Sequence, residues 1–234
     1  MECIVLAGGL GTRLQSVIGN YPKCMAEING NPFLHYLFDY LEECKCISRV
    51  ILSLGHRHEV ILDWLNTESR SFTVDHVIEE TPLGTGGGIS LAMTKALEEN
   101  VLVLNGDTMF CVDLEELMNF HITSQSATTL ALKHMKFFER YGVVKTDGSH
   151  HITAFEEKKF YEEGFINGGV YVINKSSLIE RNLPEKYSFE KDHLEAFVQE
   201  HTFYGFESEA YFIDIGIPSD YTLAQEDFKE LFEE

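Results

Sequence analysis

The fold is decided near the N-terminus by the stretch Leu6-Ala7-Gly8-Gly9-Leu10-Gly11-Thr12-Arg13-Leu14, which overlaps an apolar run from Cys3 to Ala7. A short apolar run that ends in glycines is typical of a buried strand. Because glycine has no Cβ, the backbone N–H groups of the loop can approach a bulky anion and hold its oxygens. Open parallel sheets bind nucleotides at such a junction. The stretch therefore predicts a phosphate-binding loop after a first buried strand.

The rest of the first half alternates between strand-like and helix-like patterns. This alternation indicates a parallel sheet with helices on both faces, an α/β fold of the Rossmann-like kind. Strands are expected at residues 3–7, 49–54, 72–78 and 101–104, and helices from Pro32-Phe33 onward, through residues 60–65 and at 89–97.

The second half has a different pattern, with few helices between its strands. We expect a mixed extension of the mainly parallel sheet that supplies the second wall of a cleft. The strand-like stretches are residues 127–134, 142–145, 152–156 and 169–173, and residues 221–232 are expected to form a closing helix.

Charge and composition limit the partners. The chain has 38 Asp and Glu against 18 Lys and Arg, a net charge of −20, and such a surface repels nucleic acids and anionic membranes. No apolar run is long enough to cross a membrane and no export signal is evident, so a cytoplasmic location is expected. The five scattered cysteines are then expected to be reduced, mostly buried thiols.

Two cations lie near the glycine loop, because Arg13 closes it and Pro22-Lys23 follows ten residues later. The loop is neither a Walker loop nor a dinucleotide fingerprint, since the glycine spacing and the following residues differ. Gly-Gly-x-Gly-Thr-Arg-Leu followed by Pro-Lys and Met25 closely resembles the signature of the sugar nucleotidyltransferases. The resemblance implies a glycosyltransferase-A-like sheet and one catalytic domain over residues 1–234. Its nucleotide-binding part would span about 1–125 and its sugar-binding part about 126–220.

The glycine-rich residues Thr81 to Gly88 look like the nucleoside-binding loop of this family, ahead of a helix that begins near Ile89. Glu79 and Glu80 precede it, and a carboxylate facing guanine would accept two parallel hydrogen bonds where uracil offers one donor. This favours GTP, with Glu79 as the reader of the base. An alternative stays open, in which main-chain groups read the base and both glutamates face solvent. The expected nucleotide-binding residues are Leu6, Ala7, Gly8, Gly9, Gly11, Thr12, Arg13, Glu79, Glu80, Gly84, Thr85 and Asp107.

Two aspartates suggest a metal site. Asp107 follows a predicted parallel strand at its carboxyl end, where such sheets place their chemistry. The segment around Asp214 resembles the second metal-binding motif of the family. Mg²⁺ is typically held by one or two carboxylates together with substrate phosphates. The resemblance therefore implies Mg²⁺ as the cofactor, with Asp107 and Asp214 as its ligands, whereas Asp113 is expected only to cap a helix.

Three later segments resemble sugar-binding motifs of the family. Phe-Glu-Glu-Lys at residues 155–158 implies that Glu157 accepts hydrogen bonds from sugar hydroxyls and that Lys158 neutralises the sugar phosphate. Gly168 would let the sugar ring approach the backbone, and Glu190 would meet the sugar, although the segment that begins at Ser188 also fits a plain helix cap. The expected sugar-phosphate-binding residues are Gly142, Glu157, Lys158, Asn167, Gly168 and Glu190.

Together the motifs imply an enzyme that transfers a nucleotidyl group from GTP or another NTP to a sugar 1-phosphate and releases pyrophosphate. Such a reaction needs positioning and charge neutralisation rather than a protein nucleophile. The residues expected to be catalytic are Arg13, Lys23, Asp107 and Lys158.

Within the family, the pattern is most similar to the D-glycero-α-D-manno-heptose 1-phosphate guanylyltransferases. Mannose-1-phosphate guanylyltransferases and hexose-1-phosphate uridylyl- or thymidylyltransferases are the alternatives, and a homo-oligomer stays open. A non-catalytic sensor of nucleotide sugars is disfavoured, because the aspartate pair and the cations are all present. The pairs His56/His58 and His150/His151 lack a zinc-type partner set and are given no role.

Overall fold

The computed structural model describes residues 1–9, 14, 18–19 and 21–232. The first half of the chain supplies four parallel strands of the central sheet, in which the first strand lies between the second and the fourth. Every strand predicted for this half is present, to within one residue at each end. These strands are β1 (Glu2–Ala7), β4 (Arg49–Leu54), β5 (Thr73–Ile78) and β6 (Asn100–Asn105).

The second half extends this sheet with mainly antiparallel strands. The long strand β11 (Tyr161–Asn174) pairs with β6 on one side and with β8 (Thr128–Phe138) on the other. β12 (Phe203–Ser208) joins β8 in parallel and has no counterpart in the sequence prediction, because Gly205 and polar residues interrupt its apolar pattern. A hairpin of β9 (Val144–Thr146) and β10 (Ile152–Phe155) completes the sheet.

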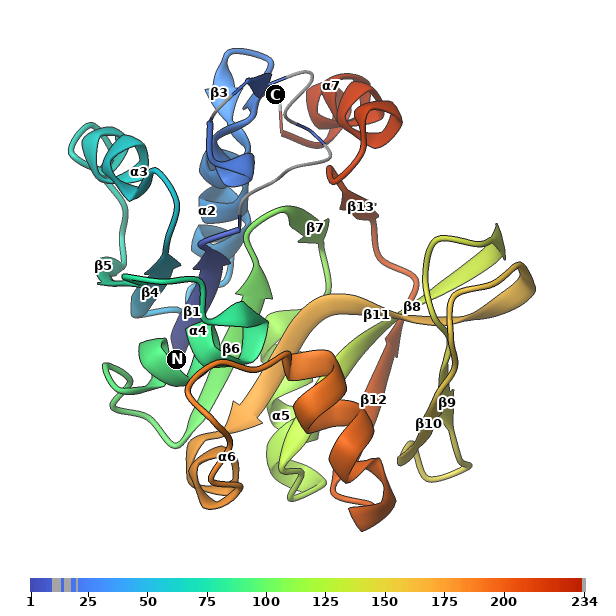
Figure 1. Cartoon of the computed structure of the whole chain (residues 1–234). Helices are drawn as coiled ribbons and strands as arrows, with labels where there is room; N and C mark the ends of the chain where they lie inside the picture. Colours follow the sequence, from blue (N-terminus) through green and yellow to red (C-terminus); the bar gives the residue numbers. More distant parts are fainter. Residues whose placement is uncertain (10–13, 15–17, 20, 233–234) are drawn as a thin grey trace.

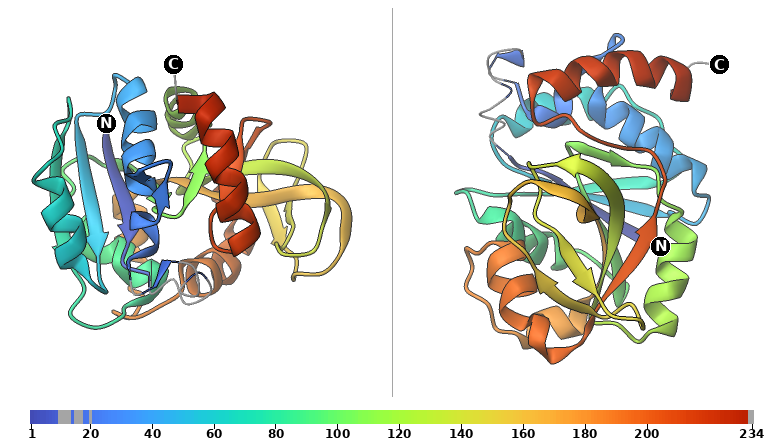
Figure 2. Two further views of the ribbon diagram at one scale, coloured as in Figure 1. Left: turned by 90° about the horizontal axis from the view of Figure 1, so that it is seen from above. Right: turned by 90° about the vertical axis from the view of Figure 1, so that its right-hand side faces the viewer.

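Across the described residues the main path of the sheet runs β10-β9-β11-β6-β1-β4-β5, with β8 beside β11 and β12 beside β8. Figures 1 and 2 show the curved strands of the second half extending away from β5. Two pairs of short strands lie outside this sheet, namely β2 (Glu27–Ile28) with β3 (Asn31–Pro32), and β7 (Thr108–Phe110) with β13 (Phe212–Asp214).

Helices pack on both faces of the sheet, as expected for this fold class. Successive side chains of a strand point to opposite faces, so Cys3 and Val5 of β1 belong to one apolar cluster and Ile4 to the other. The first cluster packs against α2 (Phe33–Glu43), α3 (His58–Leu65), α5 (Leu114–Thr123) and α7 (Pro218–Phe232). The second packs against α4 (Gly84–Met93), α6 (Lys175–Glu180), a π-helix (Phe189–Glu195) and a 3₁₀ helix (Val198–Glu200).

The glycine-rich segment is helical, which corrects the prediction of a loop followed by a helix from Ile89. α4 begins at Gly84 and ends at Met93. The glycines serve close packing, since a Cβ on Gly86 would lie 2.0 Å from Cε2 of Tyr187 and one on Gly87 would lie 2.4 Å from the carbonyl oxygen of Glu185. Tertiary contact therefore overrides the low helix propensity of glycine.

Cys44 and Cys46 form a disulfide, so the prediction of reduced thiols is wrong for this pair. They lie just after α2, where the N–H of Ile47 donates to the carbonyl of Cys44 and the turn brings the two Cα atoms to 5.3 Å. The other cysteines, Cys3, Cys24 and Cys111, are free. Across the described ranges, no helix has the length and apolar character to cross a membrane.

Candidate active site

Two cavities open at the carboxyl ends of the parallel strands and meet beside β6. The first has a volume of about 870 Å³ and lies over the ends of β1, β4 and β5. The second has a volume of about 510 Å³ and lies between β6, β11 and the π-helix. Asn105 and Asp107 line both cavities, so ligands bound in the two would meet at the end of β6.

The first cavity contains most of the predicted nucleotide-binding residues that the structure describes. Leu6, Gly8 and Gly9 line it at the end of β1, and Gly84 and Thr85 line it at the start of α4. Ala7 is the exception, because its side chain is buried in the core and does not reach the cavity. The predictions for Gly11, Thr12 and Arg13 fall outside the described residues.

Glu79 lies at the floor of the first cavity. Its Oε2 accepts a hydrogen bond from the N–H of Leu83 at 2.9 Å. A Cβ on Gly8 or Gly88 would come within 2.8 or 2.9 Å of Oε1, so these glycines leave room for the carboxylate. Glu80 also lines the cavity but is exposed. Of the two glutamates, Glu79 is therefore the one whose orientation is held by the fold.

Two histidines that the sequence analysis left without a role line the same cavity. His56 and His58 follow the carboxyl end of β4, next to the glycine loop after β1. The Nδ1 atom of His58 lies 3.2 Å from the carbonyl oxygen of Gly55. Asp107 was predicted because it follows the carboxyl end of a parallel strand. The same criterion applied to β4 would have identified His56 and His58.

Lys23, Asp107 and Asp214 come together in the second cavity, where Asp107 also borders the first. The Nζ atom of Lys23 lies 2.6 Å from Oδ2 of Asp107 and 3.2 Å from Oδ1 of Asp214. Asp107 follows β6, and Asp214 reaches it because the β7–β13 ladder pairs Asp214 with Thr108. Lys23 begins a short 3₁₀ helix, Lys23–Met25, after Pro22. Three segments far apart in the sequence thus supply one cluster of two carboxylates around a cation.

This cluster fits a divalent cation that takes some of its ligands from the protein and the others from a substrate. Two carboxylates already converge on one positive charge. In the described part of the chain no group of three or more His, Cys, Asp or Glu side chains could hold a metal ion. An ion here would therefore take part of its coordination from phosphate oxygens, as Mg²⁺ commonly does.

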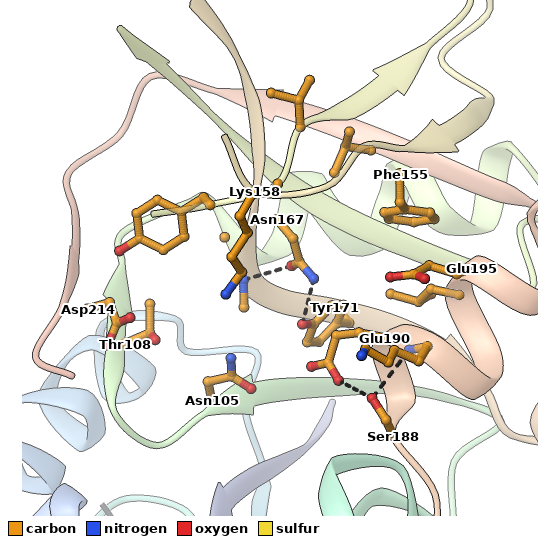
Figure 3. Close-up of a pocket in the computed structure, with 18 of the residues that line it drawn as sticks. Asn105, Thr108, Phe155, Lys158, Asn167, Tyr171, Ser188, Glu190, Glu195 and Asp214 are labelled. Atoms are coloured by element: carbon orange, nitrogen blue, oxygen red, sulfur yellow. Dashed lines mark hydrogen bonds between the residues drawn. The ribbon is translucent and has the colours of Figure 1, made fainter. Parts of the chain in front are cut away.

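All six residues predicted to bind the sugar phosphate line the second cavity, and Asp214 borders it. Figure 3 shows the side chain of Lys158 extending into the cavity between Asp214 and Asn167. Glu157 and Lys158 are exposed, which leaves both free to turn toward a ligand. The residues are Gly142, Glu157, Lys158, Asn167, Gly168 and Glu190.

A bulge in β11 orients Asn167. The register with β8 shifts between Asn167 and Tyr171, a feature that re-aims side chains next to sites. The amide of Asn167 donates to the hydroxyl of Tyr171 at 3.0 Å and accepts from the N–H of Gly169 at 3.0 Å. Packing also requires a glycine at position 168, because a Cβ there would lie 2.3 Å from Cδ1 of Phe110.

A hydrogen bond joins the two cavities. The hydroxyl of Thr85 donates to Oε2 of Glu190 at 2.8 Å and accepts from the N–H of Phe189 at 3.0 Å. Ser188 caps the π-helix by accepting from the N–H of Lys191, and its hydroxyl also donates to Glu190. The helix-cap interpretation of this segment is therefore confirmed, whereas contact of Glu190 with a sugar stays a prediction.

Sequence reasoning missed several residues that line the second cavity. Three of them lie on the π-helix, whose start was recognised but whose course was not. The missed residues include Tyr141, Lys191, Leu194 and Glu195.

A family model described as Nucleotidyl transferase matches residues 2–230. The chain belongs to this nucleotidyl transferase family. The D-glycero-alpha-D-manno-heptose 1-phosphate guanylyltransferase of Aneurinibacillus thermoaerophilus is 50% identical over 98% of this chain and 99% of that protein. The protein of the same name from Campylobacter jejuni is 42% identical over 94% of this chain and 97% of its own length.

A solved structure extends this similarity to three dimensions. The crystal structure of HddC from Yersinia pseudotuberculosis complexed with GMP-PN superposes with a TM-score of 0.86 and 38% sequence identity. The match covers 97% of this chain and 99% of that one. The predicted family and fold class are therefore confirmed.

Proposed function

We propose that this nucleotidyl transferase joins the guanylyl group of GTP to D-glycero-α-D-manno-heptose 1-phosphate, giving GDP-heptose and pyrophosphate. The observation that carries the proposal is the meeting of two cavities at Asp107, beside the cation Lys23. Full-length similarity to proteins named for this reaction supports the choice of sugar and base. A cytoplasmic location belongs to the proposal, because GTP is a cytoplasmic metabolite.

In the proposed reaction an oxygen of the sugar phosphate attacks the α-phosphorus of GTP in line. A new P–O bond forms, and the bond from the α-phosphorus to the oxygen bridging to the β-phosphate breaks, so pyrophosphate leaves. Lys158 would hold the sugar phosphate from the second cavity, and Lys23 would hold the reacting phosphates where the cavities meet. Their charges offset the negative charge that gathers when two phosphates approach, which is the main barrier to such a step. Arg13 would steady the leaving pyrophosphate.

Mg²⁺ is part of the proposal, with Asp107 and Asp214 as the residues that would hold it. When bound, the ion supplies positive charge to the reacting phosphates. The proposal rests on the convergence of the two carboxylates on Lys23. Lys23 would then release the carboxylates and contact phosphate.

Guanine recognition is proposed for Glu79. Glu79 lines the first cavity, where its Oε2 accepts from the N–H of Leu83 and its Oε1 lies beside Gly8 and Gly88, 3.5 Å from the hydroxyl of Ser53. Its free acceptor positions would take the adjacent N1–H and N2–H groups of guanine, which no other common base offers together.

Pyrophosphate release over a matrix of four NTPs and several sugar 1-phosphates tests the proposal. We expect the highest kcat/KM for GTP with the heptose 1-phosphate, in the presence of Mg²⁺. A higher value for mannose 1-phosphate, or for UTP or dTTP, would replace the assigned substrate. Release from no pair would favour the non-catalytic sensor.

A further inference from the structure

The second cavity extends beyond the predicted sugar-binding residues. Its far end is lined by Phe155, Leu194 and Glu195. Figure 3 shows Phe155 and Glu195 on the opposite side of the cavity from Asp214 and Thr108, with Lys158 and Asn167 between them. A sugar whose phosphate lies near Asp214 would therefore direct its more distant atoms toward Glu195.

The π-helix explains how Glu195 reaches this cavity. Glu190 and Glu195 are five residues apart and line the same cavity. In an α-helix, which turns by about 100° per residue, they would point about 140° apart. The i→i+5 hydrogen bonding of a π-helix underwinds the chain and brings the fifth residue closer to the same side. The rare helix type thus places a second carboxylate in the cavity.

Glu195 has no partner within the described part of the chain. No described hydrogen bond or ion pair involves its carboxylate, whereas Glu190 is held by Thr85 and Ser188. Its two neighbours at this end are apolar, since Leu194 is buried and Phe155 presents an aromatic ring. Glu195 is exposed at the cavity and lies beside one buried and one aromatic side chain, a combination that suits a ligand offering hydroxyl groups on a short carbon chain.

A heptose differs from a hexose in such a chain. Its exocyclic part carries two adjacent hydroxyl groups, at C6 and C7, where mannose has only the hydroxyl at C6. The two oxygens of one carboxylate can each accept from one hydroxyl of an adjacent pair, and hydrogen bonds to a charged acceptor are the stronger kind. The C–H groups of the chain would pack on Phe155 and Leu194.

We propose that Glu195 is a specificity-determining residue that binds the exocyclic diol of the heptose. The inference rests on the proposed function, because it names the part of the site that selects that sugar. Glu195 contacts no reacting atom, so it acts on the choice of sugar and not on the transfer of the guanylyl group. A hexose fills the remainder of the cavity equally well and leaves the carboxylate without its second donor.

The test compares Glu195→Ala and Glu195→Gln with the wild type on two sugars. The kcat/KM is measured for the heptose 1-phosphate and for mannose 1-phosphate at saturating GTP and Mg²⁺, and thermal melting checks the fold of each variant. The matched control is Glu180→Gln, which removes an exposed carboxylate outside the cavity. We expect kcat/KM for the heptose to fall about tenfold or more in Glu195→Ala and less in Glu195→Gln, whose amide oxygen still accepts. The value for mannose, which would lose one hydrogen bond where the heptose loses two, should fall less, and the KM for GTP should stay unchanged.

Different outcomes contradict the two proposals. A wild type that prefers the heptose, with the same preference in both Glu195 variants, overturns the role of Glu195 alone. Equal losses on both sugars also overturn it, because they would indicate a general role. A wild type that prefers mannose 1-phosphate overturns the heptose assignment and the inference with it.

Discussion

At the scale of single residues, the charges of Asp107 and Asp214 must be balanced both without a metal ion and with the proposed Mg²⁺. The two carboxylates of Asp107 and Asp214 are partly shielded from water and repel each other unless a cation lies between them. In this structure the cation is the ammonium group of Lys23, whose side chain is only 10% exposed. If the proposed Mg²⁺ binds at this place, the lysine is needed most when the metal is absent.

Replacing Lys23 by methionine should therefore destabilise the metal-free protein. The loss is expected to be about 1–3 kcal/mol in the free energy of unfolding, since the carboxylates lose their partner but keep some solvent. Added Mg²⁺ should raise the melting temperature of Lys23→Met more than that of the wild type. Chemical denaturation with and without MgCl₂ measures both effects, and equal responses of the two proteins would contradict a shared cation site.

The orientation of Glu79 leads to a prediction on base selectivity. Glu79→Gln should reduce the preference for GTP over UTP and dTTP by about tenfold, because the amide offers one acceptor oxygen in place of two and adds donors. Turnover should survive, since the phosphates are held elsewhere. The matched variant is Glu80→Gln, whose side chain is exposed, and it should keep the wild-type ratio of kcat/KM values. A loss of selectivity confined to Glu80→Gln would assign the base to the other glutamate.

At the scale of elements, α4 and the π-helix form one unit around the segment that ends in Tyr187. The N–H of Gly86 donates to the carbonyl of Tyr187, and the hydroxyl of Ser90 lies 2.8 Å from that of Tyr187. Together with the bond between Thr85 and Glu190, these contacts tie the first cavity to the second. The close approach depends on the absence of side chains along one face of α4.

Gly86→Ala tests this packing. An alanine usually stabilises a helix relative to glycine by about 1 kcal/mol, but here its Cβ would lie 2.0 Å from the ring of Tyr187. We expect a net destabilisation of about 1–3 kcal/mol from overpacking and higher KM values for both substrates. Gly148→Ala is the control, because nothing lies within 4 Å of the position of its Cβ. A Gly86→Ala protein as stable as the wild type would show that the two segments separate readily.

At the scale of the whole molecule, two buried histidines connect the sheet to its helices. His121 of α5 contacts the hydroxyl of Thr129 and the side chain of Asn100, and burial lowers its pKa to about 4. His193 of the π-helix lies opposite, beside Thr128, and burial lowers its pKa to about 4 as well. Both are neutral in the folded protein at neutral pH.

Stability should therefore decrease as the pH falls from about 6.5 toward 4. In this window the unfolded chain, with an ordinary histidine pKa of about 6.5, binds protons that the folded protein does not. The neutral forms thus contribute stability that is fully present above pH 6.5. His121→Gln should flatten this part of the profile, measured as the free energy of unfolding against pH. An unchanged slope in His121→Gln would contradict this contribution.

The sequence alone was sufficient to predict a structural element wherever residues close together in the chain determine it. The parallel half of the sheet was predicted from the apolar run before the glycine loop and from the alternation of strand-like and helix-like patterns. The start of α5 was predicted from Asp113, whose carboxylate accepts from the first N–H groups of the helix. The motifs also predicted part of the lining of both cavities, because a short motif lies on one strand end or helix start. The bounds of α4 and the strand β12 were not predictable in this way, since partners distant in sequence determine them.

The family resemblance implied that Asp107 and Asp214 share one ion, and in the tertiary structure both carboxylates converge on Lys23. Only the tertiary structure joined Thr85 to Glu190 and brought Glu195, His56 and His58 into the cavities. The physical reason is common to these cases. A propensity or a loop motif acts over a few residues, whereas the β7–β13 register and the packing of Tyr187 on α4 depend on contacts between distant segments. Those contacts form only when the whole sheet and its helices have assembled.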